Sequence, residues 1–318
     1  MKNTLKFFTL PAIAAIAAFM LFASCTRVQA QQFDPESHFT AWPIDGGTAM
    51  QITMYTGGSR VVRIPPTIRG VPVTRIGNEA FRGLNLTSVS IPDSVRRIGV
   101  GAFAENQLSS VTIPNSVIGI EDFAFAANRL TNVNIPNSVT SLGDMVFSQN
   151  QLSSVAIPNS ITSIGVGVFE KNQLSSVAIP TSVTSIERGA FAWNQLSSVT
   201  IPGSVTSIGN AAFRNNQLTS VTIPNSVTSI GHLVFAHNQL SSITIPDSVT
   251  SIGIGAFCWG NSVSSINIGA NVNLTYRHPV DGNIVPPFGN NFHVFYNNNG
   301  RKAGIYTWNG TAWIFKPR

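Results

Sequence analysis

Residues 174–195 read LSSVAIPTSVTSIERGAFAWNQ, and residues 196–217 repeat the pattern as LSSVTIPGSVTSIGNAAFRNNQ. The same unit returns along most of the chain with a step of 22 residues. Its isoleucine-proline pairs start at Ile91, Ile113, Ile135, Ile157, Ile179, Ile201, Ile223 and Ile245; its phenylalanines are Phe81, Phe103, Phe125, Phe147, Phe169, Phe191, Phe213, Phe235 and Phe257; its asparagines are Asn106, Asn128, Asn150, Asn172, Asn194, Asn216 and Asn238. Three columns in phase indicate a repeat protein in which every unit forms one coil.

The unit predicts parallel strands that stack side by side. In LSSVTI, apolar residues alternate with polar ones, as in a strand. The following proline ends that strand because it has no N–H to donate to a ladder. Successive coils then lie about 4.8 Å apart, with like residue over like. We therefore expect a phenylalanine spine and an asparagine ladder that satisfies backbone groups in the turns. A turn has Glu121 and Glu187 in two coils, so it does not require a positive φ. In most other coils this position, the Gly column, holds Gly99, Gly143, Gly165, Gly209, Gly231 and Gly253.

The ends of such a stack need caps, because a terminal coil exposes an open edge. We expect an N-terminal linker and cap over residues 25–62, the solenoid over 63–268, a linking loop over 269–291 and a C-terminal β cap over 292–318. Alternating Phe292, Val294 and Tyr296, followed by the hairpin signal Asn309-Gly310, predict a small β-meander in this last segment. A separate attachment module is the alternative.

The start of the chain predicts export. Lys2 and Lys6 precede an apolar run over residues 7–22, which is shorter than the about 20 residues of a membrane span, so residues 1–24 are typical of a secretory signal peptide. The sequence FASC at residues 22–25 resembles a bacterial lipobox, which makes Cys25 the site of lipidation. Cleavage after Ala30 is the alternative. The first outcome gives a lipoprotein of the cell envelope or cell surface, and the second gives a secreted protein.

The 22-residue unit resembles the BspA-type, or Treponema pallidum-type, leucine-rich repeat over about residues 60–268. That class shares the Ile-Pro, Ile-Gly and Ala-Phe landmarks and often has Cys where this chain has Asn. The resemblance implies a mainly β leucine-rich-repeat solenoid with parallel strands, here with an N-terminal β cap and a C-terminal β-meander cap. It also implies an exported bacterial surface protein of a group implicated in adhesion and host-protein binding, with no catalytic residues.

The sequence offers no candidate reaction, cofactor or metal site. His232 and His237 have no acid or cysteine near them in the sequence, and we expect both to be exposed. Cys258 shares a column with Ala, Ser, Glu and Arg, which favours a partly exposed free thiol. Removing residues 1–24 takes away two lysines, so the formal charge falls from +6 to +4, and the basic residues are scattered. A nucleic-acid partner is therefore not expected.

One variable column is our candidate binding site. It contains Glu105, Ala127, Gln149, Lys171, Trp193, Asn215, His237 and Trp259. Stacking places Trp193 and Trp259 three coils apart, or about 14 Å. We predict a binding strip of Lys171, Trp193, Asn215, His237 and Trp259; the alternative is that each tryptophan packs over the edge of a neighbouring phenylalanine. The Ser and Thr columns of the strand face lack the aromatic and arginine anchors of typical interfaces.

Together these features predict an exported, cell-surface-associated protein that binds a protein partner of a host or a bacterium. Its only contact with a membrane would be a lipid anchor at Cys25. A structural envelope component without a dedicated ligand is the first alternative, favoured by the uniform Ser and Thr face. Carbohydrate binding by Trp193, Trp259 or the C-terminal aromatics is the second.

Overall fold

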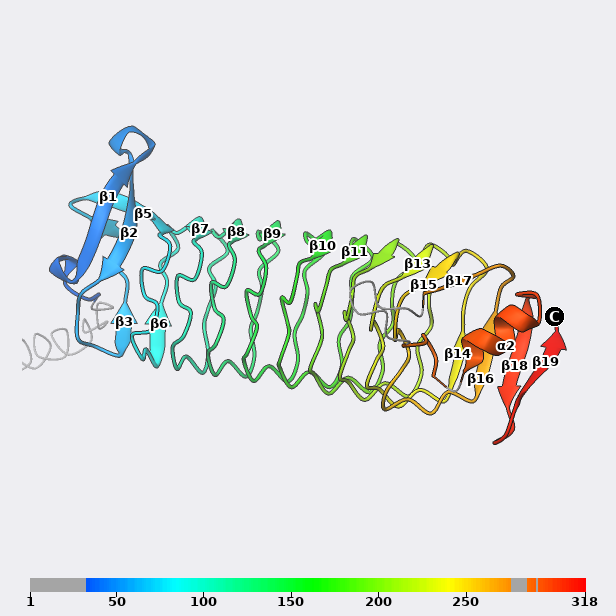
Figure 1. Cartoon of the computed structure of the whole chain (residues 1–318). Coiled ribbons are helices and arrows are strands. Elements are labelled where there is room, and N and C mark those ends of the chain that lie inside the picture. Colours follow the sequence, from blue (N-terminus) through cyan, green and yellow to red (C-terminus); the bar gives the residue numbers. More distant parts are fainter. Residues whose placement is uncertain (1–32, 276–284, 290) are drawn as a thin grey trace, which may run out of the picture.

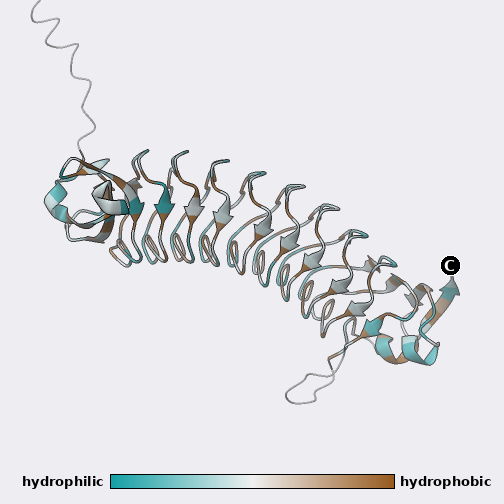
Figure 2. Ribbon diagram, turned by 90° about the horizontal axis from the view of Figure 1, so that it is seen from above, coloured by the Kyte–Doolittle hydropathy of each residue, from teal (hydrophilic) through white to brown (hydrophobic). Residues whose placement is uncertain are grey.

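The computed structural model describes residues 33–275, 285–289 and 291–318. The predicted signal peptide, with Cys25, lies outside the described residues. The chain forms a solenoid with an N-terminal β unit at one end and a helix with a hairpin at the other (Figure 1). Seen from above, the coils stack along a curved axis (Figure 2). The predicted class, a mainly β leucine-rich-repeat solenoid of 22-residue coils, is confirmed.

Most of the strands lie in a ladder along one edge of the solenoid, and this ladder is divided into two successive sheets (Figure 1). Its members after the N-terminal unit are two-residue strands, formed by the polar residue and the isoleucine or leucine that precede the Gly column. They are β7 (Arg97–Ile98), β8 (Gly119–Ile120), β9 (Ser141–Leu142), β10 (Ser163–Ile164), β11 (Ser185–Ile186), β12 (Ser207–Ile208), β13 (Ser229–Ile230), β15 (Ser251–Ile252) and β17 (Asn273–Leu274). The sequence did not predict this ladder.

The ladder that the sequence did predict, at the Val-x-Ile segment, is the weaker of the two. Full strands form only toward the ends of the solenoid, where β3 (Val61–Arg63) pairs with β6 (Ser88–Ser90) and β14 (Ser242–Thr244) pairs with β16 (Ser265–Ile268). Between them, single parallel bridges join Thr112, Asn134, Ala156, Ala178, Thr200 and Thr222 in succession. Both ladders keep the register of one coil, so equivalent residues stack as expected.

The nine phenylalanines form the predicted spine. Each is almost fully buried, and neighbouring rings stack with centroids 5.0–6.0 Å apart and planes within 18°. Such offset stacking adds about 0.5–1.5 kcal/mol per pair beyond area burial. The spine also extends past the repeat at both ends: Tyr55 stacks on Phe81 at 5.6 Å, and Phe288 stacks on Phe257 at 4.9 Å. Aromatic residues of both caps thus close the core.

The predicted asparagine ladder is present, and it joins adjacent coils. Nδ2 of Asn172 donates to the carbonyl oxygens of Phe147 at 2.9 Å, Phe169 at 3.2 Å and Glu170 at 3.3 Å. Its Oδ1 accepts the N–H of Leu152 at 3.0 Å. Phe147 lies one repeat before Phe169, and Leu152 lies one repeat before Leu174. The buried amide therefore hydrogen-bonds to the backbone of two coils. Its own polar atoms are satisfied in this way, as is usual for buried polar groups.

A second ladder of side chains follows the Gly column. Oδ1 of Asp122 accepts the N–H of Asp144 at 2.8 Å, and Oδ1 of Asn210 accepts the N–H of His232 at 2.9 Å. Nδ1 of His232 in turn accepts the N–H of Ile254 at 2.8 Å. The expectation that His232 is merely an exposed side chain is wrong, because it is half-buried and holds the next coil.

The glycines of the Gly column allow the backbones of adjacent coils to approach closely. Its glycines have no positive φ, as expected from Glu121 and Glu187 in the same column. A Cβ on Gly143 would lie 2.4 Å from the backbone N of Asp122, and one on Gly253 would lie 2.7 Å from the backbone N of His232. Glycine is used here because the backbone of the preceding coil is so near.

The N-terminal unit covers the first coil with a small sheet. In this sheet, β1 (Phe39–Ile44) pairs antiparallel with β2 (Ala49–Tyr55), and β2 pairs parallel with β5 (Val71–Ile76), which leads into β7. The short elements around it are β4 (Thr67–Ile68) and two 3-10 turns, Glu36–His38 and Asp45–Gly47. The edge strand β1 carries Pro43, which limits further pairing at this edge.

The C-terminal cap differs from the prediction in one element. Residues Phe292–Asn298 form the helix α2, not a strand, followed by the antiparallel hairpin β18 (Gly304–Trp308) and β19 (Trp313–Pro317). Phe292 and Tyr296 are fully buried whereas Val294 is 46% exposed. Residues four apart share a helix face, so the alternation at 292, 294 and 296 was misleading.

The predicted loop after Ile268 also needs correction, because the parallel ladder continues into it. β17 pairs with β15 in the register of the repeat, and Phe288 extends the phenylalanine spine. The hydroxyl of Tyr296 in α2 donates to the carbonyl of Gly269 at 2.6 Å and accepts the N–H of Val272 at 3.1 Å. These bonds fasten the cap to the last coil.

Candidate binding surface

Each coil turns back through a seven-residue segment that starts at the Gly column and ends at the variable column. We call the surface formed by these segments the turn face. It comprises residues 77–83, 99–105, 121–127, 143–149, 165–171, 187–193, 209–215, 231–237 and 253–259. The predicted strip occupies the last position of the five C-terminal segments. The structure therefore brings its residues together in one column, and whether they bind a ligand stays a prediction.

All five strip residues have left-handed backbone. Their φ values are 55° for Lys171, 59° for Trp193, 57° for Asn215, 56° for His237 and 48° for Trp259. Hydrogen bonds to the next coil hold this conformation; for example, the N–H of Trp193 donates to the carbonyl of Arg214 at 2.9 Å. This conformation was not predicted, because residues other than glycine dominate the column and left-handed backbone normally favours glycine.

Bulky side chains at these positions bring strain and little burial. A residue other than glycine in the left-handed region costs about 1–2 kcal/mol. Trp193 and Trp259 nevertheless leave 47% of their surface exposed. Neither is a member of the buried core, so folding does not explain their presence.

Trp259 and His237 form a stacked pair. Their ring centroids are 5.7 Å apart and their planes are inclined by 15°. The ring partner of Trp259 is thus a histidine, not the edge of a phenylalanine as the alternative expected. A Cβ on Gly255 would lie 3.0 Å from the Trp259 ring, so glycine at 255 makes room for the indole. This coil contains one extra residue, Gly260, so its ladder asparagine is Asn261 and not residue 260 as the repeat predicts.

The centre of the strip is polar and close to a positive charge. The guanidinium Nε of Arg214 donates to Oδ1 of Asn215 at 3.1 Å. Burial, and secondarily the charge of Arg214, lower the pKa of His237 below its ordinary value. Since His237 is then uncharged at neutral pH, the stack with Trp259 presents an aromatic surface without a charge of its own.

A second left-handed column lies four residues earlier in each segment, and the sequence analysis missed it. Its members are Glu79, Gly101, Phe123, Met145, Gly167, Gly189, Ala211, Leu233 and Gly255, with φ between 55° and 65°. The four glycines were the available signal. Phe123, 42% exposed, is the most exposed large apolar residue of this column.

The two columns border a hollow of about 430 Å³ in the N-terminal half of the turn face. Its lining includes Phe123, Ala126 and Ala127. Arg82 lies at its rim and donates to Oε1 of Glu79 and to Oε1 of Glu105, both at 2.7 Å. The hydrogen bond and charge of Arg82 lower the pKa of Glu105.

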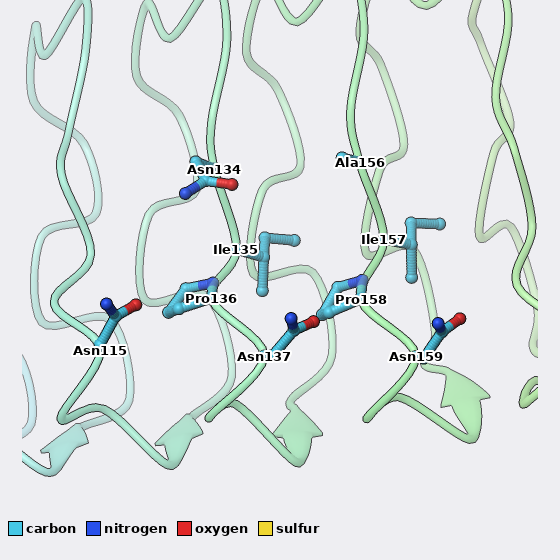
Figure 3. Close-up of a pocket in the computed structure, with 9 residues that line it drawn as sticks. All are labelled: Asn115, Asn134, Ile135, Pro136, Asn137, Ala156, Ile157, Pro158 and Asn159. Atoms are coloured by element: carbon cyan, nitrogen blue, oxygen red, sulfur yellow. The ribbon is translucent and has the colours of Figure 1, made fainter.

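A shallower hollow, of about 360 Å³, lies beside the proline turns. Figure 3 shows Asn115, Asn137 and Asn159 at equivalent places in three successive coils, with Pro136 and Pro158 between them. Its amides can hydrogen-bond a polar ligand, but it has no aromatic anchor.

Cys258 is buried, which corrects the expectation of a partly exposed thiol. Only 7% of the residue is accessible, and its thiol donates to the carbonyl of Pro286. Most neighbours in its column are also buried, among them Ala192 and Ala236. Burial raises the pKa of Cys258 to about 11, so the thiol is protonated and inert at neutral pH.

Among the residues that the structure describes, no group of three His, Cys, Asp or Glu side chains is placed to hold a metal ion. Within the same part of the chain, no helix is long and apolar enough to cross a membrane.

Comparison with known proteins identifies the repeat. The family model described as BspA type Leucine rich repeat region matches residues 74–195 and 184–278, with six copies. The solved leucine-rich-repeat protein of T. pallidum is similar at 29% identity, over 57% of this chain and 88% of that chain, with a TM-score of 0.52. One from Bacteroides ovatus is similar at 25% identity, over 77% of this chain and 66% of that chain, with a TM-score of 0.64. No curated protein matches the chain.

Proposed function

Since the chain belongs to the BspA-type leucine-rich-repeat family, we propose that it is an exported, cell-surface-associated scaffold that binds a protein partner through its turn face. Proteins built from this repeat are typically non-enzymatic binding scaffolds. The partner is a surface protein of a host or of a bacterium. Recognition depends on the area and complementarity of a rigid surface rather than on catalysis.

One observation carries the proposal: Trp193 and Trp259 are exposed at positions where the backbone disfavours them. Each is 47% exposed and has a left-handed backbone. Tryptophan is enriched among the residues that dominate the binding energy of interfaces. The strip from Lys171 to Trp259 supplies two such anchors three coils apart, with Asn215 and His237 on the two coils between them.

Binding by purified mature protein to cells, matrix proteins and envelope proteins tests this function. We expect saturable binding that the double variant Trp193→Ala/Trp259→Ala weakens at least about tenfold. Trp42→Ala is the matched control, because Trp42 is 65% exposed in the N-terminal unit, away from the turn face. Equal binding by all three proteins would remove the strip from the proposal, and the absence of any saturable binding would remove the function.

Export is tested separately. The signal-like residues 1–24 and Cys25 support it. Metabolic labelling with a fatty acid should mark the wild type and not Cys25→Ala. Unlabelled protein whose mature form starts after Ala30 would replace the lipid anchor with free secretion, and protein that keeps residues 1–24 in the cytoplasm would contradict export.

Carbohydrate binding is the second candidate, and the stack of His237 on Trp259 favours it. An exposed, uncharged aromatic face can pack against the apolar face of a sugar ring. Screening on a glycan array distinguishes the two, because a glycan receptor gives saturable signals that are lost in Trp259→Ala. If neither proteins nor glycans bind, a structural role in the envelope is what remains.

A further inference from the structure

The N-terminal half of the turn face differs in charge from the four C-terminal segments, which hold every strip residue except Lys171. Its segments 77–83, 99–105, 121–127, 143–149 and 165–171 contain six carboxylates and two cations, which is a net charge of −4. The four C-terminal segments contain one carboxylate and two cations, or +1 with neutral histidines. The whole chain is positive, at +6. A negative half-face on a positive protein selects for cationic partners.

The hollow of about 430 Å³ lies in this negative half. It exists because Gly101 has no side chain, whereas the same column carries Glu79 in the coil before and Phe123 in the coil after. Small residues, Ala104 and Ala126, complete its lining. The ring of Phe123, 42% exposed, forms an apolar wall.

The rim of the hollow carries an uncompensated negative charge. Arg82 neutralises only one of the two carboxylates that it contacts, and it takes Oε1 from each. Oε2 of Glu79 and Oε2 of Glu105 are not partners of Arg82. The hollow thus has an acidic end at Glu79 and Glu105 and an apolar end at Phe123 and Ala127.

We propose that this hollow binds an arginine or lysine side chain from a basic peptide segment of a protein partner. The aliphatic stem of such a side chain packs on Phe123 and Ala127, while its charged head reaches Glu79 and Glu105. Long basic side chains bury their stems on apolar surface and keep the head in a polar environment.

The inference rests on the proposed function, because it specifies the partner chemistry of one half of the turn face. It is independent of Trp193 and Trp259, which lie in the four C-terminal segments. Peptide binding can therefore fail while Trp193 and Trp259 still bind a partner. Conversely, the peptide can bind to a protein whose tryptophans bind no partner.

Fluorescence polarisation with a labelled peptide of alternating Arg and Ser tests the proposal. We expect saturable binding at low salt, weakened at least about tenfold by Phe123→Gly, which removes the apolar contact of the stem, and by Glu79→Gln/Glu105→Gln. Phe123→Gly should fold, because glycine occupies the same left-handed position at Gly101 and Gly167. The matched control is Leu233→Gly, in the same column of the C-terminal half, and it should change the affinity less than twofold.

Three results would overturn the proposal. The first is no saturable binding of the peptide. The second is equal loss of affinity in Phe123→Gly and Leu233→Gly. The third is unchanged affinity in Phe123→Gly with loss only in the Glu79→Gln/Glu105→Gln variant, since this would mean unspecific attraction to a negative surface rather than a site for a side chain.

Discussion

Trp193 and Asn194 are neighbours in the chain, but they have opposite roles. The side chain of Asn194 is buried, and its amide bonds two adjacent coils. Trp193 points outward from a strained backbone and is 47% exposed. The asparagine recurs through the repeat, whereas the tryptophan column holds Glu, Ala, Gln, Lys, Asn and His as well. The inward columns stabilise the stack of coils, and the outward columns give each coil a different surface residue.

The largest effect should come from removing a ring of the spine. Phe169 lies between Phe147 at 6.0 Å and Phe191 at 5.6 Å. Phe169→Ala leaves a cavity in the middle of the stack, so we expect a loss of about 3–5 kcal/mol in the free energy of unfolding. Urea unfolding measures it. The exposed Gln173→Ala in the same coil is the control, and a similar loss there would mean that inward and outward positions do not differ.

Removing a ladder amide should cost somewhat less. Asn172→Ala leaves the N–H of Leu152 without its partner, whereas the carbonyls of Phe147 and Phe169 each lose one bond and keep the one from Asn150 or Asn194. A buried N–H left unsatisfied costs about 1–3 kcal/mol and each lost hydrogen bond about 0.5–1.5 kcal/mol, although water can recover part of this, so we expect a loss of about 2–4 kcal/mol. Thermal unfolding should show the decrease, and an unchanged melting temperature would contradict a structural role for the ladder.

A buried thiol should make the C-terminal coil sensitive to alkali. The pKa of Cys258 rises from 9.0 to about 11 on folding. Between these values the unfolded chain loses its proton first, so the native state binds more protons and stability falls as pH rises. We expect a loss of about 2 kcal/mol between pH 9 and 11.

The control for this prediction is Cys258→Ala, whose unfolding free energy should decline less steeply over the same range. Tyr296 and Tyr306, whose pKa values burial also raises, account for the decline that persists. Identical slopes in the two proteins would exclude the thiol as the cause.

The smallest effect concerns the strip itself. Burial and the charge of Arg214 lower the pKa of His237, so Arg214→Gln should raise that pKa toward its ordinary value. An NMR titration of the His237 ring protons measures this shift. A lower pKa in the variant would show that Arg214 does not act on His237 by charge.

The periodic part of the fold was predictable because each inward column repeats one residue type. Phenylalanine and asparagine at a fixed step leave few alternatives to stacked coils. Strands of two residues, such as β11, are too short to produce an alternating pattern, so the main ladder was not predicted. In α2, Phe292 and Tyr296 fit either a strand or a helix face, and only contacts with the last coil decide between them.

The outward columns were less predictable. The strip was found because Trp193 and Trp259 depart from their column, but nothing in Lys, Trp or His indicates left-handed backbone. The hollow beside Phe123 depends on the absence of a side chain at Gly101 and on its neighbours in two other coils. Such a shape arises only when the register of the coils is known.

The free energy of unfolding of Trp193→Ala/Trp259→Ala tests most directly whether the outward tryptophans are displayed rather than used for folding. Urea unfolding of this variant beside Asn194→Ala compares the two roles within one coil. Our account predicts that the double variant stays within about 1 kcal/mol of the wild type, as surface substitutions do, while Asn194→Ala loses at least about 2 kcal/mol. A loss of more than about 3 kcal/mol in the double variant would contradict it.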